Sequence, residues 1–495
     1  MKDTRAKEKK TFKTKRDNYA RKLKKKKLIN YLGNELRSCS THGLPYIVEK
    51  NTHWFETAFW TTSFVCCLGL ASSLLLTQYT RYVNTPIVMS VEKDYFNWNI
   101  SYPAITLCPL EKIDEDDLNT LVNETLDSVG VDINLQLRTI ASISLETIDF
   151  LSAQFTNTSE KIIYPKDYME IITAIGKKIN NNSINTNTNW PISVESSMTE
   201  MGMCHVINSN VAIFDNPDLR RNDDIKYVKK NIDLSIYDRD FFSQISNYAD
   251  VYKVYIHHPN EIVLSTTPSY TINLEGFTYL GVQVRSTRAS NKLRNIPLTY
   301  RNCRFLDEPI SKRYPIYSYN HCILECRIQM ILKLCNCLPH FYKYMILTCL
   351  FSLPCTDYEK ICDLYELKCI ILYKMEIIKL STSENTWNKF VNKQGLPRSP
   401  RDCGCVDSCE KDVYLKEQEI YISQGDKRLR IGVSSFPKVR VVREIIFSVY
   451  DMILRSGGVI NLCLGTSIIS LMELLIIAIK LLCLLVIQHI KCIIN

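Results

Sequence analysis

The stretch AFWTTSFVCCLGLASSLLLT, residues 58–77, decides the class of this protein. It has 20 residues and no charged side chain. A helix of that length rises about 1.5 Å per residue and covers the roughly 30 Å hydrocarbon core of a bilayer. A secretory signal peptide would begin nearer residue 1, and its apolar region would be shorter. We therefore predict a first transmembrane helix over residues 58–79.

The residues before this stretch are strongly basic. Residues 1–27 contain 14 Lys and Arg and three acidic residues, whereas the whole chain has a net charge of only +9. Such a tail has three interpretations: a solvated, disordered segment, a nucleic-acid-binding segment, or a cytoplasmic anchor for anionic lipid. The predicted transmembrane helix next to the tail argues against nucleic-acid binding. By the positive-inside rule, the same basic charge places residues 1–57 in the cytoplasm.

A second apolar stretch lies near the C-terminal end. It runs from Gly457 to Ile479 and is interrupted only by Glu473, and the chain stays apolar beyond Lys480. We predict a pore-lining second transmembrane helix over residues 446–480, followed by a short apolar segment, residues 481–495. Because residues 80–445 contain no comparable uncharged run, two spans put both termini in the cytoplasm and this large region outside the cell.

Cysteines and glycosylation sequons support an extracellular location for residues 80–445. Fourteen of the 20 cysteines lie there, and eleven of these lie between Cys322 and Cys409, which is typical of a disulfide framework in an oxidising compartment. Sequons for N-glycosylation stand at Asn99, Asn123, Asn157 and Asn181. Zinc is the alternative for the two Cys-X-Cys pairs, but zinc ligands are usually spaced by two to four residues. We therefore expect no metal site.

The pattern of this region indicates an α+β domain. Residues 251–256, 270–274 and 280–284 have the alternation of strands, and residues 322–338 have helical spacing. The Asn-rich residues 180–189 are expected to form a loop. No catalytic constellation is present in the sequence, since the adjacent His257 and His258 would face opposite ways on a strand. We expect neither an enzyme nor a cofactor.

Several short motifs occur along the chain in one order. They are STHG at residues 40–43, YPAITLC at residues 102–108, GMCHVIN at residues 202–208, the cysteine clusters at residues 322–337 and 403–409, and GTS at residues 465–467 followed by IISLME. Together they resemble the degenerin and epithelial sodium channel family, particularly its insect pickpocket branch. A single match would carry no weight, but these motifs span residues 40–473 in register.

The resemblance implies a trimeric plasma-membrane channel that conducts Na⁺, is blocked by amiloride and is gated through its extracellular domain. The trimer could be formed by identical or related subunits. Gly465, Thr466 and Ser467 would form the selectivity filter, and His42 and Gly43 would act in gating. Leu454 stands at a gating position that is usually small in the family. Glu473, the only acid between Gly457 and Ile479, would face a water-filled path or a cationic partner.

The resemblance also implies a disulfide pairing. Its six bonds would be Cys108–Cys204, Cys303–Cys409, Cys322–Cys405, Cys326–Cys403, Cys335–Cys369 and Cys337–Cys362. Cys349 and Cys355 would be left over, inside an insertion over residues 344–360.

Two other functions remain open at this point. One is a two-span trimeric channel gated by an extracellular nucleotide, which would need a basic phosphate pocket and would not explain the STHG and GTS motifs. The other is a non-conducting accessory or adhesion subunit, which Leu454 and the apolar C-terminal segment favour.

Overall fold

The computed structural model describes most of the chain. The described residues are 30–49, 52–84, 87–125, 133–151, 163–179, 183–187, 192–219, 225–230, 232–238, 241–273, 276–343, 359–389, 396–424, 427–446 and 448–494. The basic tail, Asn157, Asn181, Cys349 and Cys355 therefore lie outside them. The chain divides into two compact units: residues 1–88 with 445–495, here called the helical unit, and residues 89–444, here called the disulfide-rich unit.

The larger sheet of the disulfide-rich unit has seven strands. Its order is β1-β16-β11-β15-β8-β4, and β14 also pairs with β11. The strands are β1 (Ile87–Glu92), β4 (Ile184–Thr186), β8 (Phe242–Ser246), β11 (Phe277–Ala289), β14 (Lys411–Ile422), β15 (Arg428–Ser435) and β16 (Arg440–Ile445). β11 pairs antiparallel with β14 and parallel with β15 and β16, so it forms the centre of the sheet.

A second sheet of five antiparallel strands faces this one. Its order is β10-β9-β3-β6-β5, with β3 (Ala104–Pro109), β5 (Val194–Thr199), β6 (Gly202–Ile207), β9 (Val251–His257) and β10 (Tyr270–Asn273). Two short pairs complete the strands: β2 (Ile100–Ser101) with β7 (Asp233–Leu234), and β12 (Cys303–Arg304) with β13 (Asp407–Ser408). Apolar side chains from β3, β9, β11 and β15 form one buried core, so that core lies between the two sheets.

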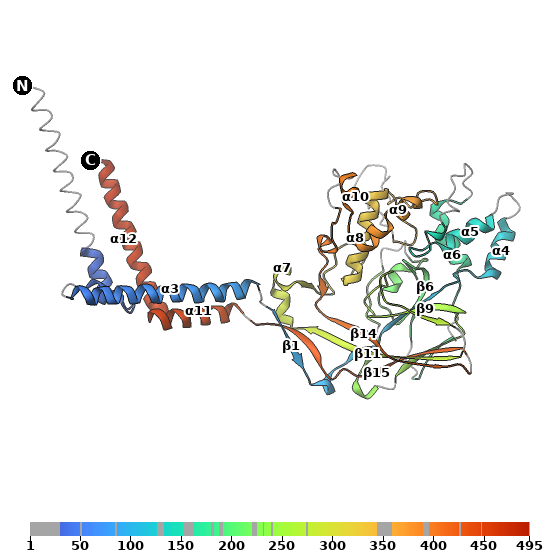
Figure 1. Ribbon diagram of the computed structural model, residues 1–495, viewed down its shortest axis with the longest axis horizontal. Coiled ribbons are helices and arrows are strands. Elements are labelled where there is room, and N and C mark those ends of the chain that lie inside the picture. The colour runs from blue at the N-terminus through green and yellow to red at the C-terminus, as the bar shows by residue number, and fades with distance from the viewer. Residues whose placement is uncertain are drawn as a thin grey trace, which may run out of the picture. The chain divides into compact units, whose positions relative to one another are not determined.

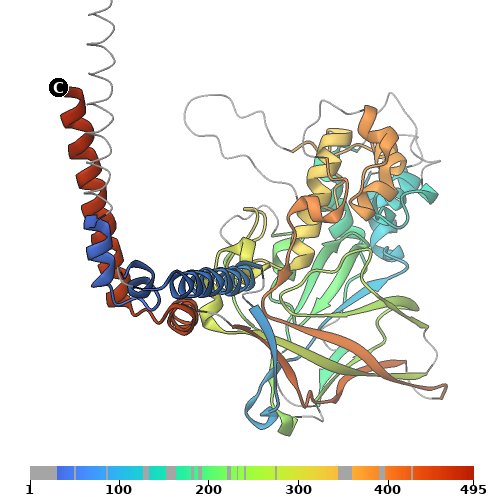
Figure 2. The ribbon, with the colours of Figure 1, turned by 60° about the vertical axis from the view of Figure 1, so that its left-hand side comes forward.

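The described residues of this unit also form helices. They are α4 (Glu115–Thr125), α5 (Ile133–Ser142), α6 (Tyr168–Ile175), α7 (Leu298–Arg301), α8 (Tyr319–Cys335), α9 (Leu367–Lys379) and α10 (Glu384–Lys389). Within this unit, α8, α9 and α10 lie together, and α4, α5 and α6 form a second group (Figure 1; Figure 2). A second apolar core joins the two groups. α8 begins at Ser318, whose hydroxyl accepts the backbone N–H of His321, as expected of an N-cap.

The predicted elements of this unit are found, with one exception. The strands predicted at residues 251–256, 270–274 and 280–284 lie in β9, β10 and β11, and the predicted helix over residues 322–338 is α8. The Asn-rich run expected to be a loop contains β4. β4 pairs antiparallel with β8, and its Ile184 packs on the core between the sheets. Pairing with β8, together with the partial burial of Ile184, therefore outweighs the loop preference of the neighbouring residues.

Among the described residues, six disulfides bind the segments of this unit together. They are Cys108–Cys204, Cys303–Cys409, Cys322–Cys405, Cys326–Cys403, Cys335–Cys369 and Cys337–Cys362, the same pairs that the family resemblance implies. Two of them join α8 to residues 403–405, and a third joins α8 to α9.

The helical unit contains α2 (Leu44–Val48), α3 (Trp54–Asn84), α11 (Val449–Leu464) and α12 (Ile468–Ile494). α3 extends beyond the predicted residues 58–79 at both ends. α12 continues through residues 481–494, so the predicted separate C-terminal segment is part of a helix. α3 and α11 lie side by side (Figure 1; Figure 2).

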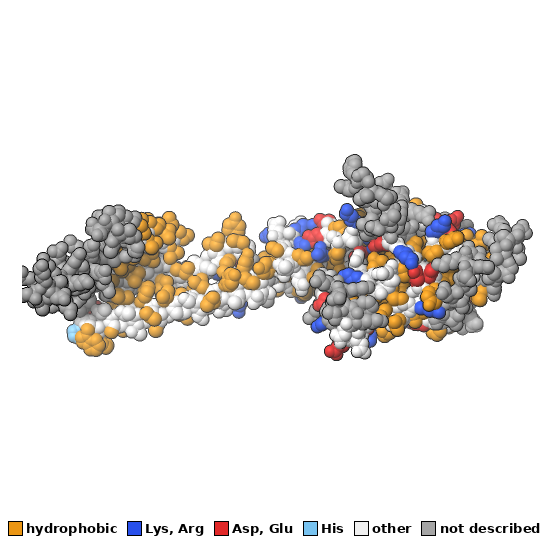
Figure 3. Space-filling view, turned by 90° about the horizontal axis from the view of Figure 1, so that it is seen from above, with side chains coloured by type: hydrophobic (Ala, Val, Ile, Leu, Met, Phe, Trp, Pro, Cys, Tyr) orange, Lys and Arg blue, Asp and Glu red, His pale blue; other side chains and the backbone are white. Residues whose placement is uncertain are grey.

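The surface of the helical unit is strongly apolar. Figure 3 shows hydrophobic side chains over much of its described surface. Phe59, Val65 and Ile476 are among the large apolar residues that are exposed. Among the described helices, α3 is the one that is long and apolar enough to cross a membrane by itself. α11 and the first part of α12 pass the same test together, as one span bent by 74°.

Candidate functional site

The break between α11 and α12 is built by residues 465–467. Gly465 ends α11 in the left-handed conformation, with φ 58°, and its N–H donates to the Asn461 carbonyl at 2.8 Å. Ser467 then precedes α12, where its hydroxyl accepts the Ser470 N–H at 3.2 Å while the Ser467 N–H donates to the Ser470 hydroxyl at 3.3 Å. Glycine and serine are the residues that favour a helix C-terminus and a helix N-terminus, so the bend follows from the local sequence.

The STHG segment, residues 40–43, lies against this break. The His42 N–H donates to the Leu464 carbonyl at 3.2 Å, and His42 Nδ1 lies 3.2 Å from the Gly465 carbonyl oxygen. That second contact is a hydrogen bond when the imidazole proton is on Nδ1. A Cβ on Gly465 would lie 1.7 Å from Nδ1, so the imidazole occupies the space that any side chain at this position would need. The His42 ring of the STHG segment can therefore lie against the break only because residue 465 has no side chain.

Ser40 joins the same segment to the first turns of α12. Its hydroxyl lies 2.7 Å from both the Ser470 Oγ and the Glu473 Oε2, and its N–H donates to the same carboxylate oxygen at 3.3 Å. The Glu473 carboxylate thus accepts hydrogen bonds from neutral donors of the STHG segment, and its contact with a water-filled path or a cation stays a prediction. Farther along α12, Lys480 lies 3.4 Å from Glu35.

Gly43 allows the chain to turn away from the break. Its φ is 90°, a conformation that L-residues rarely adopt, and it immediately precedes α2. A Cβ at Gly43 would also lie 3.3 Å from the Phe64 ring of α3. The segment is therefore held between α3 and the α11–α12 break.

The structure brings together most, but not all, of the predicted site residues of the helical unit. His42, Gly465, Ser467 and Glu473 meet at the break. Thr466 is buried there, and its hydroxyl has no hydrogen-bond partner among the described residues. Leu454 is not part of this cluster: it lies on α11, and the residue is 72% exposed.

Ser470 is not among the site residues predicted from the sequence, and Ser40 is predicted only as part of the STHG motif. The hydroxyls of Ser40 and Ser470 contact each other although the two residues are 430 positions apart, so neither residue's part in the site can be seen in its local sequence. The only local signal is the spacing Ser467-X-X-Ser470, which is typical of a helix N-terminus.

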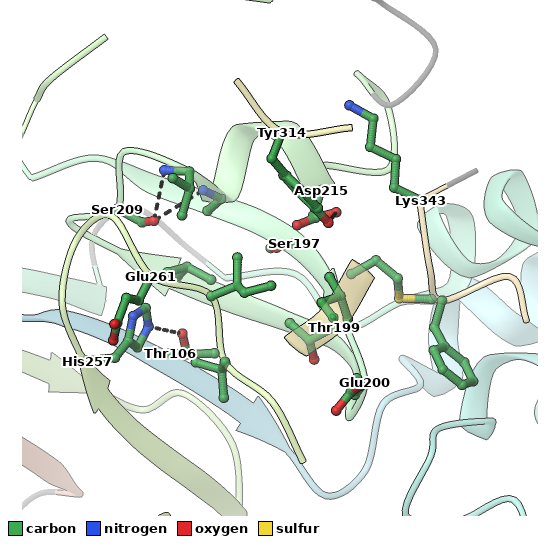
Figure 4. Close-up of a pocket in the computed structure, with 18 of the residues that line it drawn as sticks. Thr106, Ser197, Thr199, Glu200, Ser209, Asp215, His257, Glu261, Tyr314 and Lys343 are labelled. Carbon is green, nitrogen blue, oxygen red and sulfur yellow. Dashed lines mark hydrogen bonds between the residues drawn. The ribbon is translucent and has the colours of Figure 1, made fainter. Parts of the chain in front are cut away.

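In the disulfide-rich unit, a small cavity of about 30 Å³ lies beside several buried polar groups (Figure 4). Glu200 on its wall forms a fully buried ion pair with Arg327 of α8 at 2.6 Å, and it also accepts the Tyr342 hydroxyl at 2.8 Å. A buried pair of this kind locks α8 to the β5–β6 turn, because separating it would leave an unpaired charge. Its position fits a structural role.

His257 lines the same cavity and contacts the Thr106 hydroxyl through Nε2 at 2.8 Å (Figure 4). Burial lowers the pKa of His257 to about 4, so the ring is neutral at pH 7. Within the described ranges, no group of three or more His, Cys, Asp or Glu is arranged to hold a metal ion.

Comparison with known proteins gives consistent matches. The family model described as "Amiloride-sensitive sodium channel" matches residues 36–477. The chain is 20% identical to sodium channel protein Nach of Drosophila melanogaster over 482 residues, which covers 88% of this chain and 84% of that protein. It is 22% identical to the mouse bile acid-sensitive ion channel over 475 residues, covering 88% and 85% respectively. Pickpocket protein 11 of D. melanogaster is 23% identical over 243 residues, 45% of this chain and 41% of that protein.

Proposed function

Because this chain belongs to the amiloride-sensitive sodium channel family, whose members are subunits of multimeric ion channels, we propose that it is one subunit of a trimeric, sodium-selective and amiloride-sensitive cation channel of the plasma membrane. The trimer contains three copies of this chain or combines it with related subunits. In this proposal α3 crosses the membrane once and the bent α11–α12 pair crosses it a second time. Both termini are cytoplasmic, and residues 89–444 lie outside the cell.

The observation that carries the proposal is the fit between His42 and Gly465. Two short motifs that are 423 residues apart meet at 3.2 Å, and the glycine leaves just the room that the imidazole takes. A bend that only packed one helix against another would need no such partner. The contact supports a role for His42 and Gly43 in setting the conformation of the break.

The proposed filter is the Gly465-Thr466-Ser467 segment. Small residues let three copies approach closely, and a broken helix leaves carbonyls and hydroxyls available to a cation that has shed part of its water. The exposed Ser467 and the unpartnered hydroxyl of Thr466 supply such oxygens. Glu473, which lies on α12 after the break, adds a negative charge to the cation path. Leu454 of α11 lies at the gate of the pore.

Other features agree with this topology. Asn99 and Asn123 are exposed in the disulfide-rich unit, and together with Asn157 and Asn181 they are the proposed glycan acceptors. The basic N-terminal tail would contact anionic lipid on the cytoplasmic face, where each basic residue contributes on the order of 1 kcal/mol.

Whole-cell recording from cells that express the chain tests the proposal. Replacing external Na⁺ with a large impermeant cation should abolish the inward current, and amiloride should block it. A chain that reaches the surface but carries no current, alone or with related subunits, would favour the accessory-subunit alternative. A current that requires an extracellular nucleotide would favour the nucleotide-gated one.

A further inference from the structure

A second, larger cavity lies in the disulfide-rich unit. Its volume is about 250 Å³, enough for a small organic molecule. Its walls come from segments that are far apart in the chain: the start of β14 at Lys411, the turn after β9 at His258, Ser101 of β2, and Ser318 at the beginning of α8. A molecule bound here would touch both sheets and the α8 helix.

The cations of this cavity are already paired. Arg288 donates two hydrogen bonds to Asp412, at 2.6 and 3.1 Å. The other two are held by acids outside the lining, since Lys411 lies 2.6 Å from Asp407 and Lys229 lies 3.2 Å from Asp233. None of the three has a charge left without a partner.

Two acids of the cavity are unpaired. Glu410 is exposed at its edge, whereas Glu261 is partly buried. No hydrogen bond or ion pair reaches either carboxyl group from the described residues. Burial raises the pKa of Glu261 to about 7, although nearby Lys411 acts in the opposite direction. The cavity therefore contains a carboxyl group that has no counter-ion within ion-pair distance among the described residues.

His258 does not supply that counter-ion. Its Nδ1 accepts the Asn260 N–H at 3.1 Å, so the proton of the neutral ring lies on Nε2. Burial lowers the pKa of His258 to about 4, and the ring stays neutral at pH 7. The imidazole can donate one hydrogen bond to a ligand, but it offers no positive charge to Glu261.

We propose that this cavity binds a small organic cation with a primary amine or guanidinium group, whose charge pairs with Glu261 while Glu410 attracts it at the entrance. This site goes beyond the proposed channel activity, and its binding can be measured whether or not the chain conducts. The ligand would bridge wall segments that are far apart in the chain, and so would stabilise their present arrangement.

Binding should depend on pH in a defined direction. The cation pairs with the ionised carboxylate, so affinity should rise as pH increases through 7 and then level off. The groups that act on Glu261 are Lys411, Asp407 and the Tyr414 hydroxyl. Burial raises the pKa of Tyr414 well above 10, so this hydroxyl does not titrate near pH 7, whereas Glu261 does.

The test is a calorimetric titration of the purified full chain with methylguanidinium, using N-methylurea as a neutral molecule of the same shape. Methylguanidinium should bind about tenfold more tightly at pH 8 than at pH 6, and N-methylurea should not bind measurably. Glu261→Gln should weaken binding at least tenfold and abolish the pH dependence. Glu384→Gln, at an exposed position of α10 that is not part of the cavity lining, should change neither.

Three results would overturn the proposal: no binding of methylguanidinium at pH 8, equal binding of N-methylurea, or unchanged binding in Glu261→Gln. If Glu261→Gln does not fold, the pH dependence of the wild-type chain and the Glu410→Gln variant decide. Glu410→Gln should weaken binding by a smaller factor, and unchanged affinity combined with a flat pH profile would also refute the site.

Discussion

Replacing Gly465 with Ala puts a methyl group where His42 already lies. The new Cβ would be 1.7 Å from Nδ1 and 2.6 Å from Cε1 of the imidazole, both far inside van der Waals contact. The imidazole must therefore leave, or the break must change its path. We expect the first outcome, because the STHG segment is held at this point by only a few hydrogen bonds.

The cost of this change can be worked out from the structure. The left-handed conformation at φ 58° costs an L-residue roughly 1–2 kcal/mol that glycine does not incur. Displacing His42 breaks its contacts with the Leu464 and Gly465 carbonyls, about 0.5–1.5 kcal/mol each. The total is about 2–5 kcal/mol per subunit. This sum is the expected loss of stability of the folded segment, and because a Cβ 1.7 Å from Nδ1 cannot coexist with the imidazole, the displaced arrangement should replace the original one.

Cys39 provides an assay that does not depend on current. It is only 6% exposed, and its thiol lies 3.4 Å from the Thr41 hydroxyl within the same segment. Gly465→Ala should therefore raise the rate at which a membrane-permeant maleimide labels Cys39, with a Cys39→Ser chain correcting for other thiols. Gly69→Ala, on α3 with nothing within 4 Å of the added Cβ, is the matched control. Equal labelling rates in the two variants would refute the steric argument.

Three further predictions concern other parts of the chain. Cys326→Ser removes the bond to Cys403, which is worth roughly 2–4 kcal/mol, so surface biotinylation should fall; normal surface delivery would mean that the bond is dispensable. Leu454 is a bulky side chain at the point where three α11 helices would converge in a closed pore, and overpacking there would cost the closed state about 1–3 kcal/mol. In a conducting chain, Leu454→Gly should therefore reduce the standing leak current. An unchanged resting current would exclude this role. Burial holds the pKa of His257 near 4, below its unfolded value of about 6.5, so the unfolded state binds this proton first and stability should fall as pH drops from about 6.5 to 4. Thermal melts of His257→Gln should show a shallower fall, and an identical slope would contradict the assignment.

Periodicity in the sequence was sufficient for the elements whose burial is regular. The alternation in residues 251–256 marks β9 because that strand buries its side chains on a sheet face. α8 was predicted for the same reason, because successive turns of this helix bury apolar side chains against α9 and the neighbouring helices. β4 was missed because three residues among asparagines carry too little signal, and only pairing with β8 makes them a strand.

The candidate site depended much more on tertiary contacts. The motifs containing His42 and Gly465 could be named from the sequence, but their contact could not, since no local pattern relates residues 423 positions apart. Glu473 illustrates the same limit. The sequence could show only that an acid in an apolar helix needs a partner, and the partner is the hydroxyl and N–H of Ser40.

The central claim, that Gly465-Thr466-Ser467 selects the permeant ion, is tested most directly at Ser467. Ser467→Asn adds bulk while keeping a side chain that can cap α12, and Ser448→Asn makes the same change at the N-cap of α11. Ser470 is not a neutral comparison, because its hydroxyl contacts Ser40. The measurement is the reversal potential with Na⁺ on one side of the membrane and K⁺ on the other. Ser467→Asn should shift it or block the current while the surface level stays normal, and Ser448→Asn should leave it unchanged. Wild-type selectivity and conductance in Ser467→Asn would contradict the account.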